Sequence, residues 1–272
     1  MGTLEGKVAF ITGAARGQGR SHAIRLAREG ADIIAVDLCA QVDTVAYPMA
    51  TPDDLQETVR QVEALDRRIH AVRADVRDLA ALKSAVADGQ AQLGPVDIIV
   101  ANAGIVAFGA TGTTDEQAFR DVIDINLIGV WNTVTAAVPS LIEKGAGSVV
   151  LTSSTQGLKG TGGNGGGGSS AYAAAKHGVV GLMRTFTNWL SPLGIRVNSI
   201  HPTGVNTPMI VNDVMAAMFA DPTAMSDAVS NLMPVPMVEA IDVSNAIAWL
   251  VSDEARYVTG VTLPVDAGFN AK

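Results

Sequence analysis

Short apolar runs alternate with amphipathic stretches from one end of the chain to the other. The run 96–101 is nearly continuous, as expected for a strand that is buried on both faces of a sheet. The stretches between the runs have the period of a helix with one apolar face. The strand-like runs are 8–12, 32–37, 70–75, 96–101, 148–152, 196–201 and 261–265. The main helical stretches follow Gly19 to about residue 29, open at 51, and cover 78–93, 115–143, 171–190 and 241–251. This alternation predicts an α/β protein with a doubly wound parallel sheet, right-handed crossovers and helices on both faces.

Composition narrows the class of protein. With 272 residues, no linker and no break in composition, residues 1–272 are expected to form a single domain. A net charge of −8 disfavours nucleic acid and anionic membranes as partners, and no apolar run approaches the roughly 20 residues that span a bilayer. The single cysteine, Cys39, fits a reducing cytoplasm, and the four histidines show no metal-ligand spacing. We therefore expect a cytoplasmic protein without a metal site.

A glycine-rich turn joins the first strand to the first helix. It contains Gly13, Gly17 and Gly19, with Arg16 and Gln18 between them. Glycines allow the backbone to approach a pyrophosphate closely, and the N-terminus of the following helix directs N–H groups at it. The turn thus predicts a dinucleotide site in a Rossmann-type fold; a tight turn without a ligand is the alternative.

The second strand ends in a carboxylate, Asp37, about 20 residues after the glycine turn. An acid at this place accepts a hydrogen bond from the adenosine ribose 2′-hydroxyl and repels a 2′-phosphate. Asp37 therefore favours NAD over NADP. Arg16 argues weakly for the opposite, because an arginine in this turn can contact a 2′-phosphate. We give Asp37 more weight, since an unpaired carboxylate that faces a phosphate is costly.

Candidate catalytic groups follow the fifth strand. Tyr172 and Lys176 are four residues apart, so they share one face of a helix. An ammonium beside a phenol stabilises the phenolate and lowers the tyrosine pKa, which suits proton transfer at a carbonyl or alcohol oxygen. The hydroxyl of Ser154 can hydrogen-bond the same oxygen. Taken alone, this spacing also fits a half-buried tyrosine with a solvated lysine.

Together these motifs resemble the short-chain dehydrogenase/reductase family over nearly the whole chain. They occur in the family's order: Thr12-Gly13-x-x-x-Gly17-x-Gly19, Asp75-Val76, Asn102-Ala103-Gly104, Asn126, Ser154, Tyr172-x-x-x-Lys176 and Pro202-Thr203-Gly204-Val205-Asn206-Thr207. The resemblance implies hydride transfer between NAD and an alcohol or ketone. Among its implied catalytic residues, Tyr172 is the general acid/base, Lys176 binds the nicotinamide ribose, Ser154 orients the substrate oxygen and Asn126 holds a water of the proton relay. The implied cofactor-binding residues are Gly13, Arg16, Gly17, Gln18, Gly19, Asp37, Leu38, Asp75, Val76, Asn102, Ala103, Gly104, Tyr172, Lys176, Pro202, Thr203, Val205 and Thr207.

A long loop after Asp37, residues 38–52, is similar to that of the carveol dehydrogenase-like, mycofactocin-associated subgroup. In this subgroup the loop covers NAD, so the resemblance implies slow cofactor exchange and electron transfer to an external redox partner. An ordinary surface loop is the alternative. The family resemblance also implies a homotetramer that pairs the helices carrying Asn126 and Tyr172.

A methionine-rich segment, 207–237, lies where this family folds a lid over its substrate. Methionine suits adaptable apolar surfaces. We expect a small apolar substrate, a cyclic secondary alcohol or its ketone such as a monoterpenoid; steroids and 3-oxoacyl compounds are alternatives. The segment contains Met209, Met215, Met218, Met225, Met233 and Met237, which are six of the nine methionines. Packing in the core or at a subunit interface is the other interpretation of these side chains.

A glycine-rich run, Gly160–Gly168, makes the interval between Ser154 and Tyr172 longer than the family's usual dozen residues. Glycine loses the most conformational entropy on ordering, so this run predicts a mobile segment or a roomier pocket. The longer interval leaves Ser153, Ser169 and Ser170 as alternatives to Ser154. A non-catalytic nucleotide sensor on the same fold is a further alternative, although such proteins usually lack the tyrosine or the lysine. Epimerisation or dehydration of a nucleotide sugar is a third, disfavoured by the glycine spacing.

Overall fold

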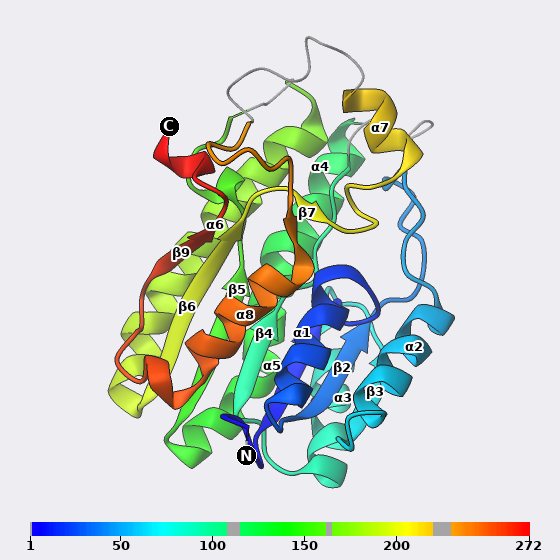
Figure 1. Ribbon diagram of the computed structural model, residues 1–272. Coiled ribbons are helices and arrows are strands. Elements are labelled where there is room, and N and C mark those ends of the chain that lie inside the picture. Colours follow the sequence, from blue (N-terminus) through cyan, green and yellow to red (C-terminus); the bar gives the residue numbers. More distant parts are fainter. Residues whose placement is uncertain (1, 108–114, 162–164, 220–229) are drawn as a thin grey trace.

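A seven-stranded parallel sheet forms the centre of the molecule (Figure 1). The computed structural model describes residues 2–107, 115–161, 165–219 and 230–272. The strand order is β3-β2-β1-β4-β5-β6-β9, which confirms the predicted single-domain, doubly wound sheet. The strands are β1 Val8–Thr12, β2 Asp32–Asp37, β3 Ile69–Arg73, β4 Ile98–Ala101, β5 Gly147–Thr152, β6 Ile195–Pro202 and β9 Thr262–Val265.

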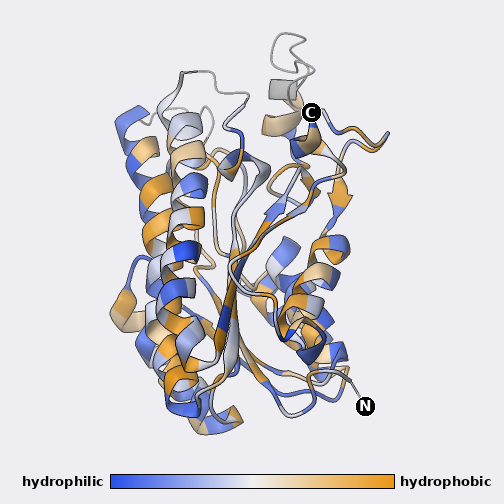
Figure 2. Cartoon of the chain, turned by 90° about the vertical axis from the view of Figure 1, so that its left-hand side faces the viewer, coloured by the Kyte–Doolittle hydropathy of each residue, from blue (hydrophilic) through white to orange (hydrophobic). Residues whose placement is uncertain are grey.

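Helices cover both faces of the sheet (Figure 2). Successive strand residues point to opposite faces: Phe10 and Ile34 pack in the core with α3, α5 and α6, whereas Ile11 and Ile33 pack with α1, α2 and α8. Burial on both sides explains why a central strand such as β4 is a continuous apolar run. The helices are α1 Gly17–Arg28, α2 Pro52–Glu63, α3 Leu79–Leu93, α5 Gly129–Lys144, α6 Gly167–Leu190 and α8 Ala240–Val251.

The strand order reverses between β1 and β4, because the chain moves outward from β1 to β2 and β3 and then returns. In open α/β sheets, ligands bind at the carboxyl ends of the strands beside this reversal. The glycine turn after β1 and the Asn102-Ala103-Gly104 segment after β4 both lie there. The topology therefore brings two of the predicted motifs to one edge of the sheet.

Three regions differ from the prediction. The expected helix 115–143 consists of α4 (Asp115–Ile123), a π-helical turn (Asp124–Ile128) and α5. Helix α6 begins four residues before the predicted start and includes two glycines of the glycine-rich run. The methionine-rich segment contains a helix that its sequence did not predict, α7 Asp213–Phe219. Two short strands that were also not predicted flank the segment, β7 Val205–Asn206 before it and β8 Val238–Glu239 after it.

One helical stretch, Asp115–Lys144, is long and apolar enough to cross a membrane by length and composition alone, which the sequence analysis did not anticipate. Its most apolar window of 18 residues is 61% buried inside the fold. Helix α4 packs on α6 and α5 packs on α3, so the apolar side chains have protein partners. This is the behaviour of a core helix.

Candidate active site

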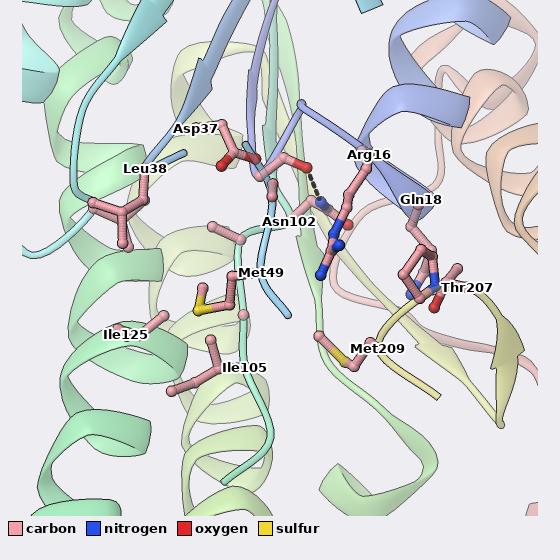
Figure 3. A pocket seen from close by; sticks show the side chains of 18 of the residues that line it. Arg16, Gln18, Asp37, Leu38, Met49, Asn102, Ile105, Ile125, Thr207 and Met209 are labelled. Atoms are coloured by element: carbon pink, nitrogen blue, oxygen red, sulfur yellow. Dashed lines mark hydrogen bonds between the residues drawn. The ribbon is translucent and has the colours of Figure 1, made fainter. Parts of the chain in front are cut away.

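A pocket opens at the carboxyl edge of the sheet, beside the reversal in strand order. Figure 3 shows Leu38, Met49, Ile105 and Ile125 on one side of it and Arg16, Gln18, Thr207 and Met209 on the other. Most of the predicted cofactor residues line this pocket: Gly13, Arg16, Gly17, Gln18, Gly19, Asp37, Leu38, Asp75, Val76, Asn102, Ala103, Gly104 and Thr207. Met209 of the predicted lid also lines it, together with residues that were not predicted as cofactor-binding: Tyr47, Met49, Ala50, Ala74, Ile105, Ile125 and Pro208.

The glycine turn is folded tightly against itself and against the segment after β4. Gly13 has a φ of +68°, and a Cβ there would lie 2.8 Å from the Ala103 Cα. A Cβ on Gly19 would lie 1.9 Å from the Gly13 carbonyl oxygen. Asn102 holds the turn from the other side, because its Nδ2 donates to the Thr12 carbonyl at 3.1 Å. Only glycine fits these two positions.

The N-terminus of α1 is suited to an anion. Its N-cap residue, Arg16, makes no side-chain capping bond, and the first turn contains no acid. The amide groups of this turn are thus available to a pyrophosphate. Gln18, which lines the pocket, has a buried Oε1 without a hydrogen-bond partner among the described residues. Since buried polar atoms normally have partners, this oxygen fits a ligand donor.

Asp37 is held rigidly at the end of β2. Its two carboxylate oxygens accept hydrogen bonds from the backbone N–H groups of Ala15 and Cys39, each at 3.0 Å. These bonds join the carboxylate to the glycine turn and to the start of the long loop. The Arg16 side chain, by contrast, donates to the Pro48 carbonyl of that loop. The arginine thus already has an acceptor within the protein.

The long loop passes along the pocket, where Leu38, Tyr47, Met49 and Ala50 form part of the wall. Its middle is attached to the body of the protein: Thr44 Oγ1 donates to Asp121 Oδ2 at 2.7 Å, and both residues are buried. The Tyr47 hydroxyl accepts from the backbone N–H of Val106 at 3.5 Å. These attachments, with the bond from Arg16 to Pro48, hold the loop on both sides of the pocket. Tyr47 is buried, and burial raises its pKa to about 12.

Helix α6 places Tyr172 and Lys176 on one face, as predicted. The Lys176 Nζ lies 5.6 Å from the centre of the Tyr172 ring and donates to the Thr152 carbonyl at 2.8 Å. The lysine is buried, and burial lowers its pKa to about 8. Burial also raises the Tyr172 pKa, while a hydrogen bond with the Ser154 side chain lowers it. Burial is the larger effect, so the Tyr172 pKa is raised, and Lys176 is not among the groups that lower it, contrary to the prediction.

Ser154 is the serine that reaches Tyr172. Its Oγ accepts from the Gln156 backbone N–H at 3.2 Å and also hydrogen-bonds Tyr172. The three alternative serines do not have Tyr172 as their hydrogen-bond partner. Ser153 donates to the Lys176 carbonyl at 2.8 Å, and Ser169 donates to the Gly166 carbonyl at 3.0 Å. Ser170 is exposed. The structure thus favours the residue chosen from the sequence.

Asn126 lies in the π-helical turn and is fully buried. Its amide donates to and accepts from the backbone of Ile105, both at 2.8 Å. A Cβ on Gly104 would lie 3.3 Å from the Asn126 oxygen and 3.6 Å from the Lys176 Nζ. Asn126, Gly104 and Lys176 therefore meet beside the pocket. Single π-turns occur often at functional sites, but no composition signal marks this one.

Some predicted residues lie apart from the pocket wall. Tyr172, Lys176, Pro202, Thr203 and Val205 are not among the residues that line it. Lys176 lies next to the wall through Gly104, and Tyr172 lies beside Lys176. Thr203 instead donates to Asn231 at 2.8 Å, which links the end of β6 to the segment before β8. Of the predicted lid methionines, Met209 lines the pocket, Met215 is buried, Met237 is half-buried and Met233 is exposed; Met225 and the Met218 side chain lie outside the described residues.

The end of the glycine-rich run is packed closely, contrary to the expectation of a mobile or open segment; residues 162–164 lie outside the described residues. A Cβ on Gly167 would lie 2.1 Å from the Asp115 carbonyl oxygen, and one on Gly168 would lie 1.9 Å from the Ala107 carbonyl oxygen. These glycines let the first turn of α6 approach two backbone segments. The length of the run therefore does not by itself enlarge the site.

We expect Gly168→Ala to lower the free energy of unfolding by about 1–3 kcal/mol, because the new methyl group overlaps a backbone oxygen. Gly181→Ala, in the same helix, is the matched control, since a Cβ there meets nothing within 4 Å. Urea unfolding of both variants measures the difference. Equal stability of the two variants would contradict the packing described.

Comparison with known proteins agrees with this site. The short chain dehydrogenase family model matches residues 7–216, and the chain belongs to this family. It is 49% identical to (−)-trans-carveol dehydrogenase of Rhodococcus erythropolis, with all of both chains covered. It is 56% identical to an uncharacterized oxidoreductase of Mycobacterium tuberculosis, over 98% of this chain and 97% of the relative. The crystal structure of carveol dehydrogenase from Mycobacterium avium in complex with NAD is 51% identical and superposes with a TM-score of 0.92 over the full length of both chains.

Proposed function

We propose that this short-chain dehydrogenase uses NAD to interconvert a cyclic, carveol-like secondary alcohol and its ketone. The observation that carries the proposal is the grouping of Ser154, Tyr172 and Lys176, with the Lys176 Nζ next to Gly104 in the wall of the pocket that the glycine turn builds. Two similar proteins also support the proposal. The M. avium structure contains NAD, and the R. erythropolis relative is named for its activity on (−)-trans-carveol. The apolar pocket residues Ile105 and Met209 agree with an apolar substrate.

The residues of the pocket fit NAD. The open N-terminus of α1 and the close-packed glycines receive the pyrophosphate, and the fixed carboxylate of Asp37 accepts from the adenosine ribose. The unpartnered Gln18 oxygen is available to the same ligand. When bound, NAD supplies the acceptor for the hydride of the alcohol.

In the proposed mechanism, Ser154 and Tyr172 hold the substrate oxygen between their hydroxyl groups. Tyr172 takes the hydroxyl proton as the alcohol is oxidised and returns it in the reverse direction. Lys176 and Asn126 lie behind Tyr172, and we assign them the passage of that proton to water. The bond between Ser154 and Tyr172 opposes the burial effect on the tyrosine pKa, so Ser154 also helps Tyr172 to act as a base.

The direct test is a rate measurement with (−)-trans-carveol and excess NAD, followed by the absorbance of reduced nicotinamide. We expect sustained turnover, with a higher kcat/KM for carveol than for a steroid alcohol or a 3-hydroxyacyl thioester. A higher kcat/KM for one of those compounds would replace carveol as the substrate class and leave the dehydrogenase assignment in place. NAD binding without turnover on any of these alcohols would favour the non-catalytic sensor.

We also propose that the loop 38–52 covers bound NAD and slows its exchange, so that an external acceptor of the mycofactocin kind regenerates the cofactor in place faster than free NAD replaces it. The support is the loop's position along the pocket and its attachments through Thr44, Tyr47 and Pro48. The residues 207–237 are proposed as the substrate lid, with Met209 facing the pocket.

We expect Thr44→Val to accelerate NAD release roughly tenfold or more, because it removes a buried hydrogen bond to the Asp121 carboxylate. The protein is desalted, and retained NAD is measured together with a single turnover of stoichiometric carveol without added NAD. Asp43→Asn is the matched control, since Asp43 is the exposed neighbour of Thr44. Equal NAD loss from both variants and the parent protein would contradict the proposed cover.

We propose a homotetramer that pairs the faces of α4–α5 and of α6. Large apolar side chains are exposed on these helices, namely Phe119, Ile128, Trp131 and Trp189, and such residues are enriched at interfaces. Light scattering is expected to give four chain masses, and Trp131→Glu is expected to reduce this to dimers or monomers. A monomeric parent protein would contradict the proposed assembly.

A further inference from the structure

Ser154 lies just beyond the point where backbone pairing between β5 and β6 stops. The register pairs Thr152 with Ile200, and the last ladder bond runs from the Ser153 N–H to the Ile200 carbonyl at 2.9 Å. In a parallel ladder the next donor would be the N–H of residue 202. That residue is Pro202, which has none. The ladder between β5 and β6 therefore ends at Ser153, one residue before Ser154.

Beyond the last ladder bond, the side chain of His201 connects β6 to the chain that follows β5. Its Nδ1 lies 2.9 Å from the Ser154 carbonyl oxygen, and its Nε2 lies 2.8 Å from the Ser199 hydroxyl. The residue is fully buried within β6. The Ser154 carbonyl also accepts the Gly157 N–H at 2.9 Å, which closes the turn after β5. One imidazole thus links the last residues of β6 to the backbone of Ser154.

The hydrogen-bond partners of His201 define which nitrogen of its imidazole ring carries the proton. A carbonyl oxygen only accepts, so Nδ1 carries the proton; in the neutral ring Nε2 then accepts from the Ser199 hydroxyl. Burial lowers the His201 pKa to about 4, with Lys176 and His177 acting in the same direction and Asp266 and the bond to Ser154 acting against it. The imidazole is consequently neutral at the pH of the reaction and keeps this single arrangement.

We propose that His201 is a positioning residue: its Nδ1–H holds the Ser154 backbone so that the serine hydroxyl stays on Tyr172. The inference rests on the proposed roles of Ser154 and Tyr172. If Ser154 moves, the hydrogen bond that lowers the Tyr172 pKa weakens, and the base becomes harder to deprotonate. Ser154 lies between His201 and the reacting atoms, so His201 acts only through Ser154.

Two isosteric substitutions separate this role from simple packing. In His201→Asn the amide nitrogen takes the place of Nδ1, so the donor to Ser154 is kept. In His201→Gln the amide lies near the place of Nε2, so that donor is lost while polarity remains. With (−)-trans-carveol and saturating NAD, we expect kcat within about threefold of the parent for Asn and a fall of about tenfold for Gln. The Kd for NAD should stay within about twofold for both variants.

The dependence of kcat on pH is a second measurement, and a change in packing alone would not alter it. Oxidation needs deprotonated Tyr172, so kcat rises with pH through the tyrosine pKa; in His201→Gln this rise is expected at higher pH, and in His201→Asn it is expected unchanged. Equal losses in the two variants, or a loss in Gln with an unmoved profile, would overturn the proposal. Absence of turnover in the parent protein would instead count against the proposed function.

A measurement on the unaltered protein covers the case in which the variants do not fold. With ¹⁵N-labelled histidine, the protein has only four imidazoles to assign. We expect His201 to be neutral at pH 7 with its proton on Nδ1. A proton on Nε2, or a charged ring at pH 7, would overturn the proposal without reference to activity.

Discussion

Tyr172→Phe is expected to reduce the kcat of alcohol oxidation by about a thousandfold, in the range observed for loss of a general acid/base. The phenol hydroxyl is the group that Ser154 contacts, and among the described residues no other phenol hydrogen-bonds that serine. The ring remains in place on α6, so the fold and the glycine turn are unaffected. We therefore expect the Kd for the reduced cofactor NADH to stay within about threefold, measured by the fluorescence of the bound NADH.

Tyr257→Phe is the control for loss of a phenol hydroxyl, because Tyr257 is 88% exposed. The pH profile adds a second check. Burial raises the Tyr172 pKa, so oxidation should become faster with rising pH, while reduction, which needs the protonated phenol, should become slower. A Tyr172→Phe protein with the parent's kcat would remove Tyr172 from the mechanism.

Asp37→Asn is expected to reduce the preference for NAD over NADP by about a hundredfold. A unit charge near a 2′-phosphate is worth about 3 kcal/mol at 5 Å with an effective dielectric constant of 20, which corresponds to that factor. The affinity for NAD itself should also fall, because an amide can accept only one of the two backbone bonds from Ala15 and Cys39. The ratio of kcat/KM for the two cofactors measures the effect.

Asp75→Asn makes the same change of charge on the wall of the same pocket and serves as the control. Asp75 is paired with Arg77 at 2.6 Å, so its charge is already compensated. We expect this variant to leave the cofactor preference within about threefold. Equal changes in the two variants would mean that total charge, and not the position of Asp37, decides between the cofactors.

Local patterns in the sequence predicted those parts of the fold that depend on local physics. Burial on both faces makes a central strand such as β4 a continuous apolar run, and the ends of helices follow from capping residues. Thr51 and Asp54 form the reciprocal capping bonds at the start of α2, with Pro52 in the first turn as expected. The spacing of Tyr172 and Lys176 similarly placed both side chains on one face before any tertiary contact was known.

Long-range contacts explain what the sequence did not predict. Tyr47 faces the pocket because distant groups hold its loop, among them Asp121 and the N–H of Val106. Helix α6 includes Gly167 despite the entropy cost, since only glycine permits its contact with the Asp115 backbone. The direction of the Tyr172 pKa shift depends on burial, and burial cannot be deduced from the four-residue spacing of Tyr172 and Lys176.

The central claim is that this site transfers a hydride from a secondary alcohol to NAD with Tyr172 as the base. The most direct test uses carveol labelled with deuterium on its carbinol carbon, followed by mass spectrometry of the nicotinamide after a single turnover. We predict one deuterium in the reduced cofactor for the parent protein and none above background for Tyr172→Phe in the same time. Oxidation of the labelled carveol without deuterium in the nicotinamide, or equal labelling with both proteins, would contradict the account.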